Sequence, residues 1–126
     1  MAEAVKAARD NLPAEIDPKG ALEILERYRG TKDCVLIDVR EPEEYEKGHI
    51  EGAKNINCRD KGVLSREIAG LDKDCTYILY CRHGIRAPQV LQYMVDRGFP
   101  KVCSIMGGIQ NWQAQGMPVV REEAFE

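Results

Sequence analysis

The apolar positions of the chain fall into short continuous runs separated by segments with helical spacing. Three runs are rich in β-branched and aromatic residues and have the length of buried strands: residues 34–39 (CVLIDV), 76–81 (TYILYC) and 102–106 (VCSIM). Residues 53–58 (AKNINC) form a fourth, less regular strand candidate. The chain is therefore predicted to build its core around a β-sheet.

Helices are predicted in the intervals between these runs. Asp17 and Pro18 supply an N-cap and a proline for a first helical turn, and apolar residues then recur with helical spacing as far as Gly30. The other predicted helices cover residues 42–48, 63–71, 87–98 and 107–116. Strands that are apolar on both faces and alternate with helices indicate the α/β class, with a mostly parallel central sheet and helices on both faces.

Length and composition indicate one globular domain. The chain has 126 residues, with 44% hydrophobic and 31% charged residues, and we expect residues 14–120 to form the domain. Residues 1–13 and the short acidic tail 121–126 are expected to be mobile. The net charge of −3 points to neither a nucleic acid nor a membrane surface as partner, and no apolar run could cross a bilayer. Without a recognisable signal peptide, a cytoplasmic location is expected.

Five cysteines are present, at positions 34, 58, 75, 81 and 103. Their odd number and the lack of any C-x2-C pair argue against a zinc site and against a framework of disulfides. Cys34, Cys75 and Cys103 lie in or beside predicted strands, where a free cysteine acts as a small apolar residue.

The segment 80–88, YCRHGIRAP, places Cys81 at the end of a predicted strand, directly before a loop and a helix. Parallel sheets bind ligands outside the carboxyl ends of their strands, and the following helix starts there with free N–H groups and partial positive charge. Gly84 permits an unusual backbone angle, and Arg82 and Arg86 add positive charge. This environment would favour the thiolate of Cys81 and make it a nucleophile. An ordinary buried strand cysteine fits the spacing equally well.

Polar residues elsewhere allow both a structural and a functional interpretation. Asp38 and Arg40 stand at the end of a predicted strand, where they either brace the Cys81 loop electrostatically or form an ordinary surface ion pair. His49 is interpreted as a structural residue that holds a turn through its ring nitrogens. Trp112, which lies between glycines, is interpreted as a packing anchor.

Three segments resemble successive signatures of the rhodanese-like sulfurtransferase family. They are VLIDVREPEEYEKGHIEGAKNI (35–56), YCRHGIRAPQV (80–90) and MGGIQNWQAQGMPV (106–119), and they occur in the family's order and at its separations. The resemblance covers residues 14 to 119 and implies a single-domain member with a rhodanese-like fold.

The resemblance implies an enzyme in which Cys81 accepts a sulfane sulfur and carries it as a persulfide. By position, the backbone of the next five residues would form a cradle around that sulfur: Arg82, His83, Gly84, Ile85 and Arg86. The donor would be thiosulfate or a similar small molecule, and the acceptor would be cyanide, glutathione or a protein cysteine. No metal or organic cofactor is implied. Cys58 could resolve the persulfide by forming a disulfide with Cys81.

Loop length separates sulfur transfer from the other chemistries of related proteins. Cys81 to Arg86 is a C-x4-R loop, one residue shorter than the C-x5-R loop of the related phosphatases and arsenate reductases. A shorter loop makes a tighter ring of N–H groups, which suits a sulfur atom better than a tetrahedral oxyanion. The alternative to an enzyme is a sulfur carrier or partner-binding module without turnover. An arsenate reductase or phosphatase is disfavoured by the loop.

Two positions of the loop differ from common members of the family. His83 stands where a small or hydroxylated residue is frequent, and Ala87 follows Arg86 where serine is frequent. These differences bear on the choice of donor more than on the type of reaction.

Overall fold

Five parallel strands form one sheet in the computed structural model, which describes residues 12–121. The strands are β1 (Glu15–Ile16), β2 (Cys34–Asp38), β3 (Lys54–Asn55), β4 (Thr76–Tyr80) and β5 (Val102–Ile105). Their order across the sheet is β1-β5-β4-β2-β3. All pairings between these strands are parallel, which confirms the predicted α/β class with a parallel central sheet.

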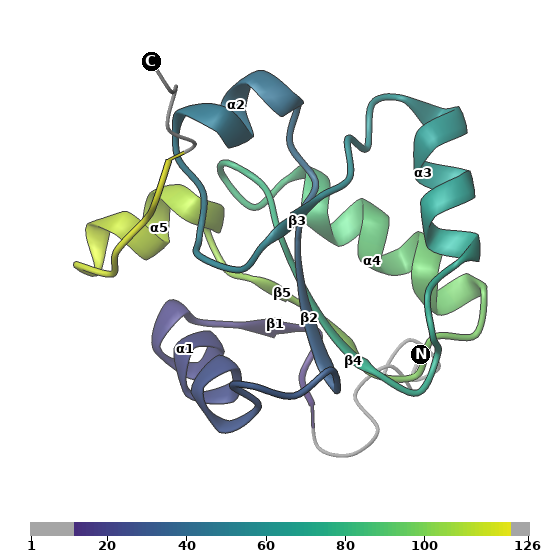
Figure 1. Cartoon of the computed structure of the whole chain (residues 1–126), viewed down its shortest axis with the longest axis horizontal. Helices are drawn as coiled ribbons and strands as arrows, with labels where there is room; N and C mark the ends of the chain where they lie inside the picture. Colours follow the sequence, from purple (N-terminus) through teal and green to yellow (C-terminus); the bar gives the residue numbers. More distant parts are fainter. Residues whose placement is uncertain (1–11, 122–126) are drawn as a thin grey trace.

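Helices cover both faces of this sheet, as predicted. They are α1 (Pro18–Arg27), α2 (Pro42–Lys47), α3 (Lys61–Ala69), α4 (Arg86–Asp96) and α5 (Gly108–Ala114). Figure 1 shows α1 and α5 on one side of the sheet and α3 and α4 on the other, with α2 beyond the end of β2. The predicted cap of α1 is present, because the carboxylate of Asp17 accepts a hydrogen bond from the N–H of Gly20 at 2.9 Å.

Two apolar clusters hold the helices against the sheet. One contains Ile37 of β2 together with side chains of α3 and α4, such as Val90. The other contains Leu36 of β2 together with side chains of α1 and α5, such as Ala21 and Trp112. Successive residues of a strand point to opposite faces, so neighbours in β2 enter different clusters. Burial on both faces explains why the central strands are continuous apolar runs in the sequence.

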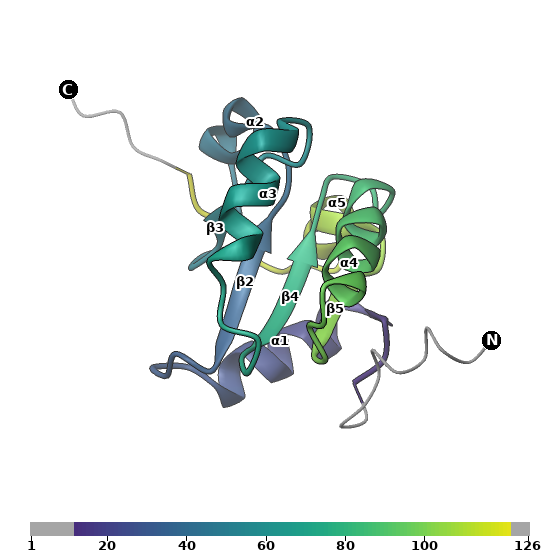
Figure 2. The ribbon, with the colours of Figure 1, turned by 90° about the vertical axis from the view of Figure 1, so that its right-hand side faces the viewer.

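The carboxyl ends of β2 and β4 lie side by side. Asp38, the last residue of β2, pairs in register with Tyr80, the last residue of β4. Figure 2 shows the arrows of both strands pointing toward the end of the sheet where α2 lies. Cys81 directly follows Tyr80, so the register brings Asp38 and Cys81 to the same end of the sheet, as the sequence predicts.

Two helices begin earlier than predicted. α3 begins at Lys61, because the carboxylate of Asp60 accepts a hydrogen bond from the N–H of Val63 at 3.1 Å and so caps the helix. α4 begins at Arg86 rather than at residue 87. Ala87 is the second residue of α4, so its N–H belongs to the first helical turn, where such groups have no partner within the helix.

One strand, β1, is not among those predicted. It has two residues, of which only Ile16 is buried, so no apolar run marks it in the sequence. Apart from residues 12, 13 and 121, the predicted mobile segment 1–13 and tail 121–126 lie outside the described residues. None of the helices between residues 12 and 121 combines the length and the apolar character needed to cross a membrane.

Candidate active site

The loop between β4 and α4 wraps its backbone around the sulfur of Cys81. The backbone nitrogen of Gly84 lies 3.2 Å from Sγ and that of Ala87 lies 3.3 Å from it, and both N–H groups donate hydrogen bonds to the sulfur. Cys81 is only 1% exposed, so water cannot supply those bonds. Hydrogen bonds to an ionised acceptor are stronger than those to a neutral one, so this arrangement can hold an anionic sulfur.

The two donors come from different parts of the loop. Gly84 belongs to the predicted cradle of residues 82–86, and Ala87 lies just beyond it. The N–H of Ala87 is available because α4 begins at Arg86, which makes it one of the first N–H groups of the helix. Of the remaining cradle residues, Arg86 is half-buried, and three have exposed side chains: Arg82, His83 and Ile85.

Gly84 occupies a position that a residue with a side chain could fill only with strain. Its φ is +90°, in the left-handed region that favours glycine. A Cβ at this position would lie 2.9 Å from the backbone nitrogen of Gly107, a distance that real Cβ atoms do not adopt. Glycine at position 84 is therefore needed both for the backbone angle and for the close approach of the segment before α5.

The start of α5 packs directly on the backbone of the loop. The N–H of Ile109 donates to the carbonyl of Cys81 at 2.9 Å, and the N–H of Gln110 donates to the carbonyl of Arg82 at 3.1 Å. A Cβ on Gly108 would overlap that same carbonyl of Arg82. Gly107 and Gly108, at the start of α5, thus leave room for the backbone of the Cys81 loop, a role that the sequence pattern did not reveal.

A charged residue of α2 pairs with the arginine of the loop. The carboxylate oxygens of Glu44 lie 3.3 and 3.4 Å from the guanidinium nitrogens of Arg86. Partial burial acts to raise the pKa of Glu44, but hydrogen bonds from Arg86 and from the N–H of Glu41 outweigh this effect and lower it. Burial acts to lower the pKa of Arg86, and its pairing with Glu44 raises it overall. Both groups therefore carry charge at neutral pH.

The sequence did not single out Glu44. Glutamates stand at positions 41, 43, 44 and 46 in and beside α2, and only the packing of this helix selects one of them as the partner of Arg86. Because α2 follows the end of β2 and α4 follows the end of β4, the ion pair connects the two central strands at their carboxyl ends.

Asp38 and Arg40 form a buried ion pair, which excludes the ordinary surface pair, one of the two interpretations of these residues; their bracing role stays a prediction. Asp38 is 0% and Arg40 6% exposed, and a guanidinium nitrogen lies 2.8 Å from the carboxylate. The same nitrogen donates to the carbonyl of Gly48 at 2.6 Å. Within residues 12–121, neither side chain hydrogen-bonds to the Cys81 loop. Arg40 acts electrostatically on Glu44, so any bracing of the loop is indirect.

The exposed His83 is tied to α5. Its Nδ1 lies 2.6 Å from the side-chain oxygen of Gln110, whose backbone N–H also bonds to the loop. The bulky residue at the third position of the loop is thus held against α5, away from the hydrogen bonds that reach the sulfur.

Cys58 lies close enough to Cys81 for the two thiols to influence each other electrostatically. Burial raises the pKa of Cys58; Cys81 adds to this effect, and Arg86 and Arg59 oppose it. A thiol with a raised pKa is a poor nucleophile at neutral pH. The resolving role of Cys58 stays a prediction.

His49 and Trp112 have the structural contacts that were predicted for them. The Nδ1 of His49 lies 2.9 Å from the carbonyl of Tyr45, and the two rings stack with centroids 3.8 Å apart. Trp112 is buried, and its indole N–H donates to the carbonyl of Pro118 at 2.8 Å. In the part of the chain that the structure describes, no three His, Cys, Asp or Glu side chains are grouped to hold a metal ion.

Comparison with known proteins gives this loop its family context. The model of the rhodanese-like domain matches residues 21–115, a segment that contains the loop, Glu44 and the glycines at the start of α5. The chain belongs to the rhodanese-like domain family. Strand β1 lies outside the matched segment, at the edge of the sheet.

Relatives of this rhodanese-like domain include proteins named as sulfurtransferases. A sulfurtransferase from Allochromatium vinosum is 30% identical over 109 residues, which cover 86% of this chain and 96% of the relative. The thiosulfate sulfurtransferase GlpE from Coxiella burnetii is 35% identical over 83 residues, which cover 66% of this chain and 75% of the relative. A solved rhodanese-related protein from Thermoplasma volcanium matches with a TM-score of 0.73 and 28% identity, over 86% of this chain and 98% of that one. These likenesses support a sulfurtransferase at the level of the family.

Proposed function

We propose that this rhodanese-like domain moves a sulfane sulfur from thiosulfate, or a similar small donor, to a thiophilic acceptor through a persulfide on Cys81. The observation that carries the proposal is the pair of backbone N–H groups, from Gly84 and Ala87, that donate to Sγ. Membership of the family supports sulfur as the group that is transferred.

In the first half of the reaction, the thiolate of Cys81 attacks the outer sulfur of thiosulfate. A new S–S bond forms at Sγ, the S–S bond of thiosulfate breaks, and sulfite leaves with the electron pair. The charge then resides on the outer sulfur of the persulfide. Fixed N–H dipoles that are already aimed at the sulfur stabilise the anion without reorganising during the reaction.

In the second half, an acceptor nucleophile attacks the outer sulfur of the persulfide. Cyanide or a thiolate forms a bond to that sulfur, the S–S bond to Sγ breaks, and the thiolate of Cys81 is regenerated. Both halves are displacements at sulfur, so their rates depend on the thiolate fraction of the nucleophile and on the leaving group, as in thiol–disulfide exchange.

The charged groups around the loop favour negative charge near Sγ. Arg86 supplies a positive charge beside Sγ, and Glu44 fixes the guanidinium from the other side. Arg82 is exposed and sits next to the nucleophile in the chain, so it can attract an anionic donor. Because Cys81 is almost completely covered, a donor must present a narrow, extended sulfur to reach it.

Intact-mass measurement after incubation with thiosulfate tests the proposal. We expect the wild-type protein to gain the mass of one sulfur atom, and the adduct to disappear on addition of excess cyanide or glutathione. Cys81→Ser is expected to gain nothing, whereas Cys58→Ser is expected to load as the wild type does.

Repeated turnover with excess donor and acceptor distinguishes an enzyme from a carrier, because a carrier loads once and then stalls. The proposal would be abandoned if no sulfane donor loaded the protein, or if the adduct formed equally well on Cys81→Ser.

A further inference from the structure

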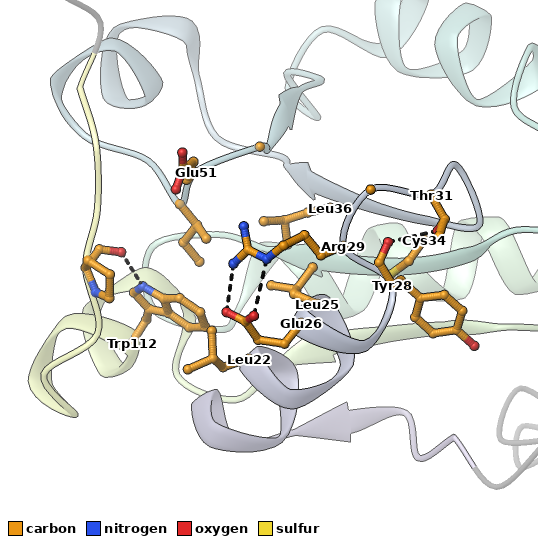
Figure 3. A pocket seen from close by; sticks show the side chains of 14 residues that line it. Leu22, Leu25, Glu26, Tyr28, Arg29, Thr31, Cys34, Leu36, Glu51 and Trp112 are labelled. Atoms are coloured by element: carbon orange, nitrogen blue, oxygen red, sulfur yellow. Dashed lines mark hydrogen bonds and ion pairs between the residues drawn. The ribbon is translucent and has the colours of Figure 1, made fainter.

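A cavity of about 360 Å³ lies on the face of the sheet that α1 and α5 cover. Its volume falls within the range of small-molecule sites, roughly 300–1,000 Å³. Figure 3 shows that side chains of α1, β2 and α5 line it, among them Leu25, Leu36 and Trp112. The cavity can therefore hold the body of a small organic molecule.

This cavity is separate from the site at Cys81. Among residues 12–121, its lining comes from the apolar cluster that packs on α1 and α5, whereas Cys81 belongs to the cluster on the other face of the sheet. Cys34 lines the cavity at the start of β2, and Cys81 follows the end of the parallel strand β4. The sheet thus lies between the two places, so a molecule in the cavity would be a second ligand and not the sulfur donor or acceptor.

The floor of the cavity is apolar and its mouth is open. Five buried or half-buried apolar side chains form the floor: Leu22, Leu25, Leu36, Ile50 and Trp112. At the mouth, Gly30 and Gly52 are exposed, and a Cβ on either would meet no atom within 4 Å. An apolar group of a ligand can enter there, and its removal from water on the floor is favourable.

The charged side chains at the rim leave an excess of negative charge. The guanidinium of Arg29 is bound to the carboxylate of Glu26 at 2.8 Å, as Figure 3 shows. Glu51, in the segment between α2 and β3, faces the cavity from the other side and acts on Arg29 only by longer-range electrostatic attraction. Within residues 12–121, no cation lies at ion-pair distance from the carboxylate of Glu51. One negative charge at the rim is therefore left for a ligand.

We propose that this cavity binds a small organic cation, an amine with an alkyl or aryl body, whose apolar part packs on the floor and whose ammonium group pairs with Glu51. The combination of an apolar wall and a single well-placed charge is typical of small-molecule sites. Burial raises the pKa of the Cys34 thiol to about 11, so this side chain is neutral and acts as a further apolar contact. An anionic ligand of the same shape would be repelled by Glu51.

The fluorescence of Trp112, the only tryptophan of the chain, reports on occupation of the cavity. Titration with phenylbutylamine at neutral pH is expected to change this fluorescence and to saturate, and calorimetry run in parallel should give the same affinity. Phenylbutanol, which has the same body without the charge, should bind about three- to fivefold more weakly, the range expected of an exposed ion pair. Phenylpentanoate, which carries a carboxylate, should bind more weakly still.

Two glutamine variants test the role of Glu51. Glu51→Gln is expected to lower the affinity for the amine to that for the alcohol, and to leave the affinity for the alcohol unchanged. Glu46→Gln removes an exposed carboxylate of α2 that does not line the cavity, and it should bind all three ligands as the wild type does. Thermal melts check that both variants are folded, and the outcome does not depend on sulfur transfer at Cys81.

Equal affinity of the wild type and Glu51→Gln for the amine would overturn the inference, as would tighter binding of the carboxylate than of the amine. The lack of binding of all three ligands in both measurements would overturn it as well. A Trp112 signal that changes with protein concentration in the absence of ligand would show that a second copy of the chain covers the cavity, and this result too would reject the amine site.

Discussion

Cys81 and Cys103 are both buried, but the protein surrounds them differently. Cys103 is 0% exposed within β5, and burial in an apolar cluster raises its pKa to about 12. Cys81 is 1% exposed, yet two backbone N–H groups donate to its sulfur. Burial is the same at the two sites, so burial alone does not distinguish the two thiols. The difference lies in the end of the strand, where the loop and the start of α4 supply donors that the interior of the sheet lacks.

The same serine substitution at the two cysteines gives the largest contrast. Cys81→Ser is expected to lose all sulfur transfer and to stay folded, since the hydroxyl can accept the same N–H donors. Cys103→Ser is expected to keep the transfer activity but to lose about 1–3 kcal/mol of stability, because it buries a hydroxyl in an apolar cluster. Turnover assays and denaturant titrations measure the two effects. Comparable activity losses in both variants would remove the distinction between the two sites.

Alanine substitutions at two glycines separate the effect of a close contact in the loop from the effect of the strained backbone angle. Gly84→Ala is expected to reduce turnover at least tenfold, because the new Cβ would push against Gly107 and displace a donor from Sγ. Gly30→Ala is the matched control: its φ is +81°, close to the +90° of Gly84, but nothing lies within 4 Å of the added Cβ. Each substitution should cost about 1–2 kcal/mol of stability from the backbone angle. Equal activity of the two variants would show that the contact with Gly107 does not matter.

Neutralising Glu44 tests the outer charges of the loop and should have a smaller effect. Glu44→Gln is expected to lower turnover about threefold, in keeping with a partly exposed ion pair worth less than about 1 kcal/mol. Glu43→Gln, on the exposed face of the same helix, serves as the control and should change turnover little. Steady-state kinetics at low salt compare the two. An equal loss of turnover in both variants would mean that the total negative charge of α2 matters, and not the contact of Glu44 with Arg86.

The contribution of the Glu44–Arg86 ion pair to the stability of the protein should decrease on acidification. The pKa of Glu44 is lowered in the folded protein, so its contribution to stability is complete above the unfolded-state pKa, about 4.3, and is lost as the pH falls through the folded value. The stability difference between the wild type and Glu44→Gln should therefore be constant above about pH 5 and shrink below about pH 4. Denaturant titrations across this range measure it. A difference that grows on acidification would mean that the sign is wrong.

The sequence predicted the parts of the fold that local pattern determines. The central strands β2, β4 and β5 are continuous apolar runs because both of their faces are buried, and α1 carries its cap and proline in sequence. β1 could not be predicted, because two residues at the edge of a sheet form no pattern of their own. Its place is determined by pairing with β5, a contact between residues far apart in the chain.

The residues of the candidate active site also divide into those that local pattern reveals and those that only packing reveals. The cysteine, the glycine and the arginine of the loop could be found because they lie within a few residues of one another. Glu44, Gln110 and Gly108 reach the loop only through the packing of α2 and α5, so their roles were visible only in three dimensions. The predicted helix start also leaves the N–H of Ala87 without a partner in the helix, but only the folded loop shows that this N–H points at Sγ.

The pH dependence of alkylation, resolved for each cysteine by mass spectrometry, tests the central claim most directly. If the N–H donors of the loop stabilise an anionic sulfur, Cys81 should already be alkylated at neutral pH, where Cys34 is not. Cys34, whose pKa burial raises to about 11, should react appreciably only in strong alkali. Alkylation of Cys81 that rises together with that of Cys34 would show that the loop merely buries its cysteine, and would contradict the account.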